Sequence, residues 1–193
     1  TDLKLGANGK FISSKLETYS SIGAALDLAA LYEFKESNSV ITLVASNLGV
    51  QFTAYEETKE SIPFHVDLAF AKKLENLPLK WHIVFENLQQ WDLSFENPNR
   101  GEEDLDGTTT PENISVFNKF MQHLVIGGEL FHGKALNLRL GYNFRRGHEL
   151  KIEDNRVFAG ITAGFGLKLN KFRVNYAFQK FSAATSVHTF GLN

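Results

Sequence analysis

The sequence predicts an all-β fold of about ten antiparallel strands, and two observations lead to this prediction. First, apolar and polar residues alternate with a period of two along most of the 193 residues, which places them on opposite faces of a strand. Second, short and long connections between these alternating segments follow one another along the chain. The composition agrees with strands, because the chain has 17 Phe and 15 Gly but only 4 Pro.

The alternation is clearest between 136 and 145, where Leu138 and Leu140 share one face of the predicted strand. Arg139 and Asn143 fall on the opposite face, so the two faces differ in polarity. The same reasoning predicts strands, with a blurred pattern in the third, near 2–11, 21–34, 39–48, 64–70, 80–86, 123–130, 136–145, 157–169, 171–179 and 185–193.

The connections are sorted by length. Tight turns are predicted at 35–38, 75–78, 132–134 and 170–171. Between them lie links that are mostly longer, at 14–20, 49–62, 89–120, 146–156 and 181–184. Bacterial outer-membrane barrels have short periplasmic turns and long extracellular loops, whereas a soluble sandwich has no reason to sort its loops in this way. One short helical turn is predicted within 112–120.

Two faces of opposite chemistry admit two interpretations. In a soluble β-domain the apolar face points into a core, whereas in an outer-membrane barrel it meets lipid. Aromatic residues near predicted strand ends, such as Trp81, Trp91 and Tyr142, are typical of the girdles at membrane interfaces. They favour an antiparallel transmembrane β-barrel that forms a single domain over 1–193.

A strand that begins at the first residue leaves an open sheet edge, which lipid does not tolerate. Either the ten strands close on themselves or further strands precede Thr1. The topology favours the second alternative: with the short turns in the periplasm, residue 1 also starts there, and an even number of strands is expected upstream.

Composition argues against several classes of protein. The net charge is −2 and no basic stripe occurs, so a nucleic-acid partner is not expected. The absence of Cys excludes disulfides, thiolate metal sites and a Cys nucleophile. No Gly-x-Ser-x-Gly motif occurs either, and we predict neither an enzyme nor a cofactor.

The polar face carries the titratable residues. His65 with Asp67, and His82 with Glu86, could in principle form a metal site or a proton relay. Such residues are more often the hydrated lining of a barrel, and no metal ligand is predicted. Arg139, Arg145 and Arg173 would add a positive stripe, and mixed charge of this kind predicts internal ion pairing.

The surface formed by the loops 89–120 and 146–156 is the best candidate for a functional site. Trp91 and Phe95 resemble the aromatic anchors of protein interfaces, and the acidic run 102–106 flanks them. Alternatively, Trp91 merely ends the aromatic girdle. The candidate partner-binding residues are Trp91, Asp92, Phe95, Asn97, Pro98, Arg146, His148 and Glu149.

Several segments are recognisable in order along the whole chain. The strongest are WDLSFENPN at 91–99, HLVIGGEL at 123–130 and NLRLGYNFRR at 137–146, with weaker ones at 47–49, 60–64, 78–81, 160–171 and 182–185. With these segments the chain resembles the FadL-like outer-membrane proteins of Bacteroidetes, and within them the PorQ-type members that accompany type IX secretion.

The resemblance implies a barrel of about 14 strands, of which this chain would supply the last ten, with N-terminal strands missing. It also implies an outer-membrane location and a non-enzymatic role in protein secretion and cell-surface attachment. The implied partners are outer-membrane lipid and the surface attachment proteins PorZ, PorU and PorV. The alternatives are a FadL-like transport channel for small hydrophobic molecules and a soluble β-domain.

Overall fold

The computed structural model describes most of the chain, namely residues 2–16, 19–53, 61–93, 102–103, 109–110, 115–149, 159–180 and 185–193. Ten of its strands form one sheet: β1 (Leu3–Leu16), β2 (Tyr19–Phe34), β3 (Ser39–Thr53), β4 (His65–Lys73), β5 (Leu79–Phe85), β8 (Leu124–Leu130), β9 (Leu136–Asn143), β10 (Ile161–Leu169), β11 (Phe172–Lys180) and β12 (Ser186–Leu192). The other elements are β6 (Glu102–Glu103), which pairs with β7 (Thr109–Thr110), and the helices α1 (Val116–Gln122) and α2 (Phe144–Glu149).

The ten strands lie in the sheet in the order of the sequence, from β1 to β12. This order confirms the predicted all-β class and the single antiparallel sheet of ten strands. The sheet is not closed, because β1 and β12 are its two edges. The contacts between residues divide the chain into two compact units. Unit 1 comprises Thr1–Leu77 and His82–Gln89, and unit 2 comprises Pro78–Trp81 and Gln90–Asn193.

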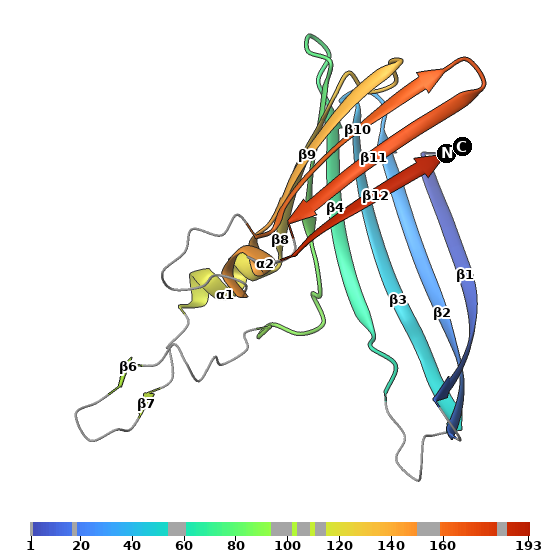
Figure 1. Ribbon diagram of the computed structural model, residues 1–193, viewed down its shortest axis with the longest axis vertical. Coiled ribbons are helices and arrows are strands. Elements are labelled where there is room, and N and C mark those ends of the chain that lie inside the picture. Colours follow the sequence, from blue (N-terminus) through green and yellow to red (C-terminus); the bar gives the residue numbers. More distant parts are fainter. Residues whose placement is uncertain are drawn as a thin grey trace. The chain divides into compact units, whose positions relative to one another are not determined.

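In unit 1 the register gathers apolar residues on one face. Leu5 lies opposite Ala30, Ala30 opposite Leu43, and Leu43 opposite Leu68. Directly opposed residues of antiparallel strands point to the same side of the sheet. One apolar row therefore crosses β1 to β4, the first three of which are seen side by side in Figure 1. Leu5 is 76% exposed at the β1 edge.

Unit 2 repeats the arrangement across five strands. Leu130, Leu138, Phe165, Tyr176 and Phe190 lie opposite one another in turn from β8 to β12. The neighbouring row on the other face begins with Glu129 opposite Arg139. The predicted separation of apolar and polar residues onto two faces is thus present in both units.

The described residues contain almost no dry core. Only Ala25, Leu93 and Ala159 are buried hydrophobic residues, whereas large apolar side chains of the sheet are exposed. Leu140, in the middle of unit 2, is 64% exposed. A soluble β-domain would instead bury this face against a second layer. Within the described residues no helix is long and apolar enough to cross a bilayer.

Three predicted strand ends in unit 1 were wrong. Residues 14–16 and 19–20 were expected in a loop, but they continue β1 and β2, because Ser14 pairs with Ser21 and Lys15 with Ser20. β3 runs to Thr53 instead of ending near 48. Its pairing with β2 shifts register twice, and each shift moves the apolar residues to the other side of the alternation. The shifts fall at 46–47 and at 52, so the alternation could not be followed to the end of β3.

The strand predicted over 136–145 ends earlier, at Asn143. The Asn143 side-chain oxygen accepts a hydrogen bond from the Arg146 backbone N–H at 3.0 Å, which is the geometry of a helix N-cap. Phe144 and Arg145 therefore belong to α2 and not to the strand. The next strand was predicted over 157–169. Residues 157 and 158 lie outside the described residues, and β10 begins at Ile161, after Gly160 with φ +87°. The short helix expected within 112–120 is confirmed by α1.

Candidate functional site

α1 is a short helix that exposes its apolar residues and buries polar residues at its C-terminal end. The Ser115 hydroxyl caps it by accepting a hydrogen bond from the Phe117 backbone N–H at 3.3 Å. At its other end Gln122 and His123 are only 3% and 2% exposed. Neither polar atom of the Gln122 side chain has a hydrogen-bond partner among the described residues. Burial of unpaired polar groups is costly. This end of the helix is nevertheless buried, whereas its apolar residues face solvent.

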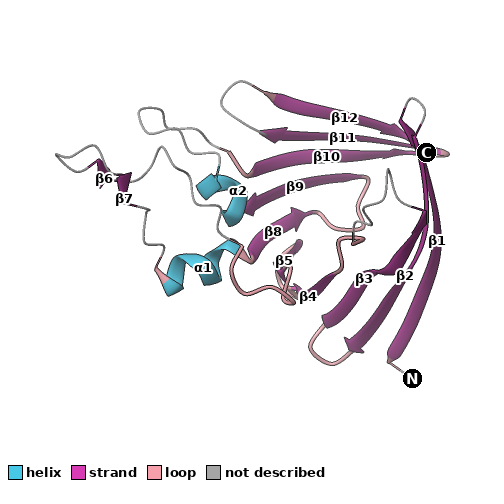
Figure 2. Cartoon of the chain, turned by 90° about the horizontal axis from the view of Figure 1, so that it is seen from below, coloured by secondary structure: helices cyan, strands magenta, loops and turns pink. Residues whose placement is uncertain are grey.

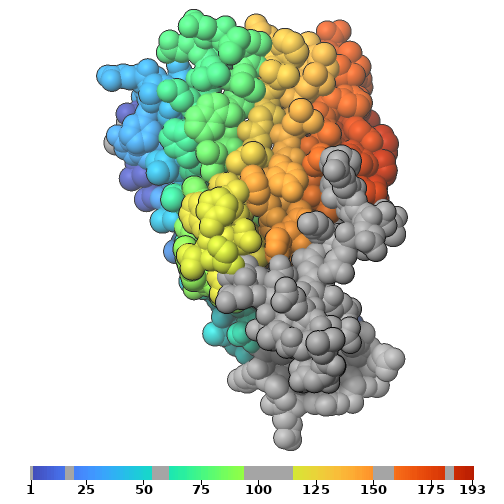
Figure 3. Space-filling view, turned by 90° about the vertical axis from the view of Figure 1, so that its left-hand side faces the viewer, coloured from blue at the N-terminus to red at the C-terminus, as the bar shows by residue number. Residues whose placement is uncertain are grey.

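The apolar side chains of α1 are exposed, and so is Trp91, which lies at the end of the helix. Val116 and Phe117 are 69% and 67% exposed, Phe120 is also exposed, and Trp91 is 57% exposed. Figure 3 shows α1, in yellow, at the surface. We call these four residues the α1 patch. Large exposed aromatic side chains are typical of the residues that anchor protein interfaces.

The position of Trp91 is set by contacts at the end of α1. Its ring stacks on the buried His123 ring, with centroids 5.7 Å apart and 28° between the planes. The His123 Nε2 atom and the Trp91 carbonyl oxygen lie at hydrogen-bond distance, 3.1 Å. Asp92 forms an ion pair with Lys119 of α1. These contacts hold Trp91 and Asp92 against the helix.

α2 supplies the second half of the site. It contacts α1, and the two helices lie side by side in Figure 2. Arg145 and Glu149 form an ion pair across one turn at 3.8 Å. Tyr142, just before the helix, packs edge-on against Phe144 with ring centroids 4.9 Å apart. A side chain at Gly147 would collide with the Tyr142 hydroxyl, so this close approach requires glycine.

The predicted partner-binding residues are partly brought together. Trp91 and Asp92 lie against α1, and Arg146, His148 and Glu149 lie on α2. Phe95, Asn97 and Pro98 fall outside the described residues. The sequence prediction missed Val116, Phe117, Phe120 and His123. Ser115 followed by an apolar i, i+1, i+4 pattern was the available signal, but a helix this short has a weak pattern.

The titratable residues on the polar face of unit 1 are used structurally. His65 and Asp67 approach to 3.8 Å, but the Asp67 carboxylate also accepts a hydrogen bond from the Asn87 backbone N–H at 3.0 Å. Among the described residues no group of three or more potential metal ligands occurs. Asp27 pairs with Lys10 at 2.7 Å and accepts the backbone N–H of Asn47 at 2.9 Å.

The positive stripe expected on the polar face is present in part. Arg139 lies 3.5 Å from the Glu129 carboxylate, as internal ion pairing predicts. Arg145 is in α2 and so does not belong to the stripe. Arg173 is on the polar face of β11, opposite Lys168, and among the described residues it has no acidic partner.

Comparison of the chain with protein-family models, with curated proteins and with solved structures finds no match.

Proposed function

We propose that this chain belongs to a FadL-like outer-membrane β-barrel of the PorQ type and that it holds surface proteins of the type IX secretion system without catalysing a reaction. One observation carries the proposal. A ten-stranded sheet sorts its residues onto two faces, and the apolar face lacks a protein layer that would cover it among the described residues. Lipid is the environment that such a face fits.

The energetics of the apolar face support a bilayer. Removing one Leu side chain from water is favourable by about 1.5–3 kcal/mol. Leu5, Leu43, Leu138 and Leu140 are all exposed in the chain by itself, so an apolar environment would stabilise the sheet by a comparable amount at each position. The charged residues take the opposite face, where Lys10 pairs with Asp27 and Arg139 with Glu129.

The lengths of the connections between strands support one orientation of the sheet across the membrane. The links 35–38, 74–78, 131–135 and 170–171 are all short, whereas the links from β5 to β8 and from β9 to β10 are long and contain both helices. Short turns in the periplasm and long loops outside are the rule for bacterial barrels. In this orientation the α1 patch lies on the cell surface, where secreted proteins are attached.

A partner protein is the occupant that the α1 patch fits best. Trp91 is fixed by the stacked His123, and the next residue is fixed by the Asp92–Lys119 ion pair, so this side chain loses little conformational freedom on binding. The resemblance to PorQ-type proteins points to PorZ as that partner, together with PorU and PorV. The ion pairs on the polar face argue against a channel for hydrophobic molecules, which needs an apolar path.

The location can be tested by fractionating cells that make the full-length protein. We expect the protein in the outer-membrane fraction, released by detergent and not by salt or alkaline buffer. Recovery as a monodisperse monomer in buffer without detergent would contradict the proposal.

The docking surface can be tested by replacing two residues of the patch with acids. We expect Phe117→Glu with Phe120→Glu to abolish co-purification of PorZ, because charges in the centre of an apolar interface are costly. The matched control is Leu77→Glu, which changes an exposed leucine in the short link 74–78 and should retain PorZ. Retention of PorZ by the double variant would overturn the assignment of the patch. If the patch instead rests on lipid, the variant would lose membrane insertion and keep PorZ.

A further inference from the structure

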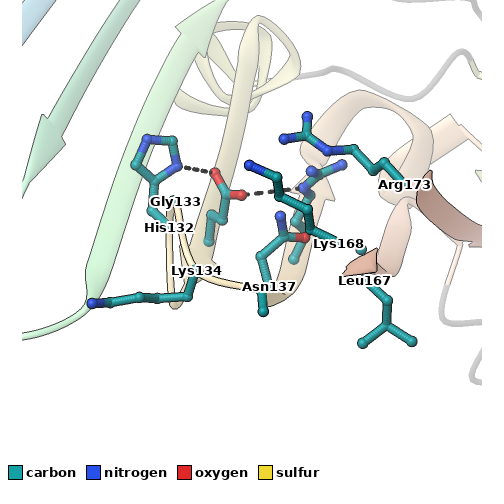
Figure 4. A pocket seen from close by; sticks show the side chains of 11 residues that line it. His132, Gly133, Lys134, Asn137, Leu167, Lys168 and Arg173 are labelled. Atoms are coloured by element: carbon teal, nitrogen blue, oxygen red, sulfur yellow. Dashed lines mark hydrogen bonds and ion pairs between the residues drawn. The ribbon is translucent and has the colours of Figure 1, made fainter. Parts of the chain in front are cut away.

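A small basic pocket lies on the polar face of unit 2, at the end of the strands where the short turns are. Its volume is about 230 Å³, and Figure 4 shows it from close by. The turn 131–135 forms one wall, and the facing ends of β10 and β11 form the other. Neither the candidate docking surface nor the scaffolding role proposed above uses this pocket.

Positive charge exceeds negative charge in the pocket. Arg139, Lys168 and Arg173 line it, and Glu129 is the one acidic residue among the lining residues. The Glu129 carboxylate is already engaged, because it lies 2.7 Å from His132 Nδ1 and 3.5 Å from Arg139 Nε. It therefore does not neutralise the other two cations.

Lys168 and Arg173 form an unfavourable like-charged pair in the pocket. They lie directly opposite each other on β10 and β11, and like charges in that position destabilise a sheet. Within the described part of the chain neither side chain has an ion-pair or hydrogen-bond partner. Figure 4 shows both side chains at the pocket, whereas Lys134 points away from it. An anion between the two would remove the repulsion.

The base of the pocket is kept open by a glycine. Gly166 is buried, and a Cβ atom there would lie 2.7 Å from Asn137 Oδ1 and 3.0 Å from Asn175 Oδ1. The buried Asn137 Oδ1 atom has no hydrogen-bond partner among the described residues. Rotation of this amide by half a turn exchanges its oxygen for an NH₂ donor, which is the group that an oxyanion requires.

We propose that this pocket binds a phosphate group, carried either by a soluble molecule or by a lipid headgroup. Guanidinium groups bind phosphate oxygens with two parallel hydrogen bonds, and an ammonium group adds a point charge. Arg139, Arg173 and Lys168 supply these groups, and the Asn137 amide supplies a neutral donor at the base. This assignment is independent of the scaffolding role, since it concerns the opposite end of the strands.

Binding can be measured on the full-length protein in neutral detergent at low ionic strength, by calorimetric titration with inorganic phosphate. We expect saturable binding that Lys168→Gln with Arg173→Gln weakens by about tenfold or more. The matched control removes two charges without touching the pocket: Lys35→Gln with Lys171→Gln, of which Lys171 lies in the same hairpin. It should bind as the unchanged protein does.

A second variant gives a result that misfolding cannot imitate. Glu129→Gln removes the competing carboxylate, so we expect it to bind phosphate more tightly than the unchanged protein. Equal or weaker binding by this variant would overturn the proposal.

The source of the phosphate is distinguished in bilayer discs. If a lipid headgroup is bound, the protein will enrich an anionic phospholipid over a zwitterionic one, and Lys168→Gln with Arg173→Gln will abolish that enrichment. If a soluble molecule is bound, inorganic phosphate will bind with no lipid preference. Absence of both phosphate binding and lipid enrichment would show that the pocket is not an anion site.

Discussion

The polar faces of units 1 and 2 both combine acidic and basic side chains, but they balance charge differently. In unit 1 one carboxylate, Asp27, receives Lys10 at 2.7 Å, the Asn47 backbone N–H at 2.9 Å and Asn8 at 3.3 Å. In unit 2 one carboxylate, Glu129, shares a pocket with Arg139, Lys168 and Arg173. Of these three only Arg139 reaches it, together with the His132 ring.

This difference indicates that the charged groups of unit 1 stabilise the fold, whereas the surplus charges of unit 2 are available to bind a ligand. A closed network such as that around Asp27 fixes the backbone, since its carboxylate holds the bulge at Asn47, where φ is +61°. An unbalanced cluster such as Lys168 with Arg173 stabilises nothing by itself. We therefore expect substitutions in the first region to affect stability, and substitutions in the second to affect binding.

The largest loss of stability is expected at Gly49, where β3 approaches β2 closely. A side chain at Gly49 would collide with the Ala24 carbonyl oxygen and with Ala25 on β2. Because backbone cannot yield as a side chain can, Gly49→Ala should lower the free energy of unfolding by about 3 kcal/mol. Urea unfolding followed by Trp fluorescence in detergent will measure this. Gly9→Ala is the control, since a Cβ there meets nothing within 4 Å, and equal midpoints for the two variants would refute the close approach.

A smaller loss is expected from the network itself. Asp27→Asn keeps the shape of the side chain but removes the charge that holds Lys10. The thermal unfolding midpoint should fall, by less than for Gly49→Ala. Asp2→Asn, which breaks the exposed ion pair with Lys35 at 2.6 Å, should leave the midpoint almost unchanged. If both Asp variants behaved alike, the unit 1 network would not be structural.

The smallest effect is expected in unit 2, and its sign is opposite. Lys168→Gln with Arg173→Gln removes the like-charged pair, so stability in phosphate-free buffer should stay equal or rise by about 0.5 kcal/mol. The gain should disappear at high salt, which screens the repulsion. Unfolding at low and at high salt checks this, and a loss of stability at low salt would mean that these cations are structural.

The strands and their two faces could be predicted from the sequence because period-two alternation is local. The apolar rows through Leu43 and Leu138 follow directly from it. The ends of strands could not be predicted as well. Asn47 and Asn143 have the same side chain, yet one forms a bulge inside a paired strand and the other caps a helix. Pairing with the neighbouring strand decides between these outcomes, and the sequence pattern does not contain that information.

The candidate sites were predictable to a smaller extent. Trp91 was predicted as an anchor, but the residues that fix its position, His123 and α1, are not singled out by the alternating pattern. The positive stripe was predicted from Arg139, Arg145 and Arg173, of which Arg145 lies in α2. The excess charge of the other two depends on which carboxylate reaches which cation. That choice is made by the turn 131–135, which places His132 on Glu129.

Accessibility of spin labels in bilayer discs tests most directly which face of the sheet meets lipid. The chain has no Cys, so single cysteines can be introduced at Leu138, Arg139 and Leu140 without removing native ones. Labels at 138 and 140 should collide with oxygen, which concentrates in lipid, and the label at 139 should be protected from it. The opposite alternation, or collision of all three labels with a water-soluble nickel complex, would contradict the membrane assignment.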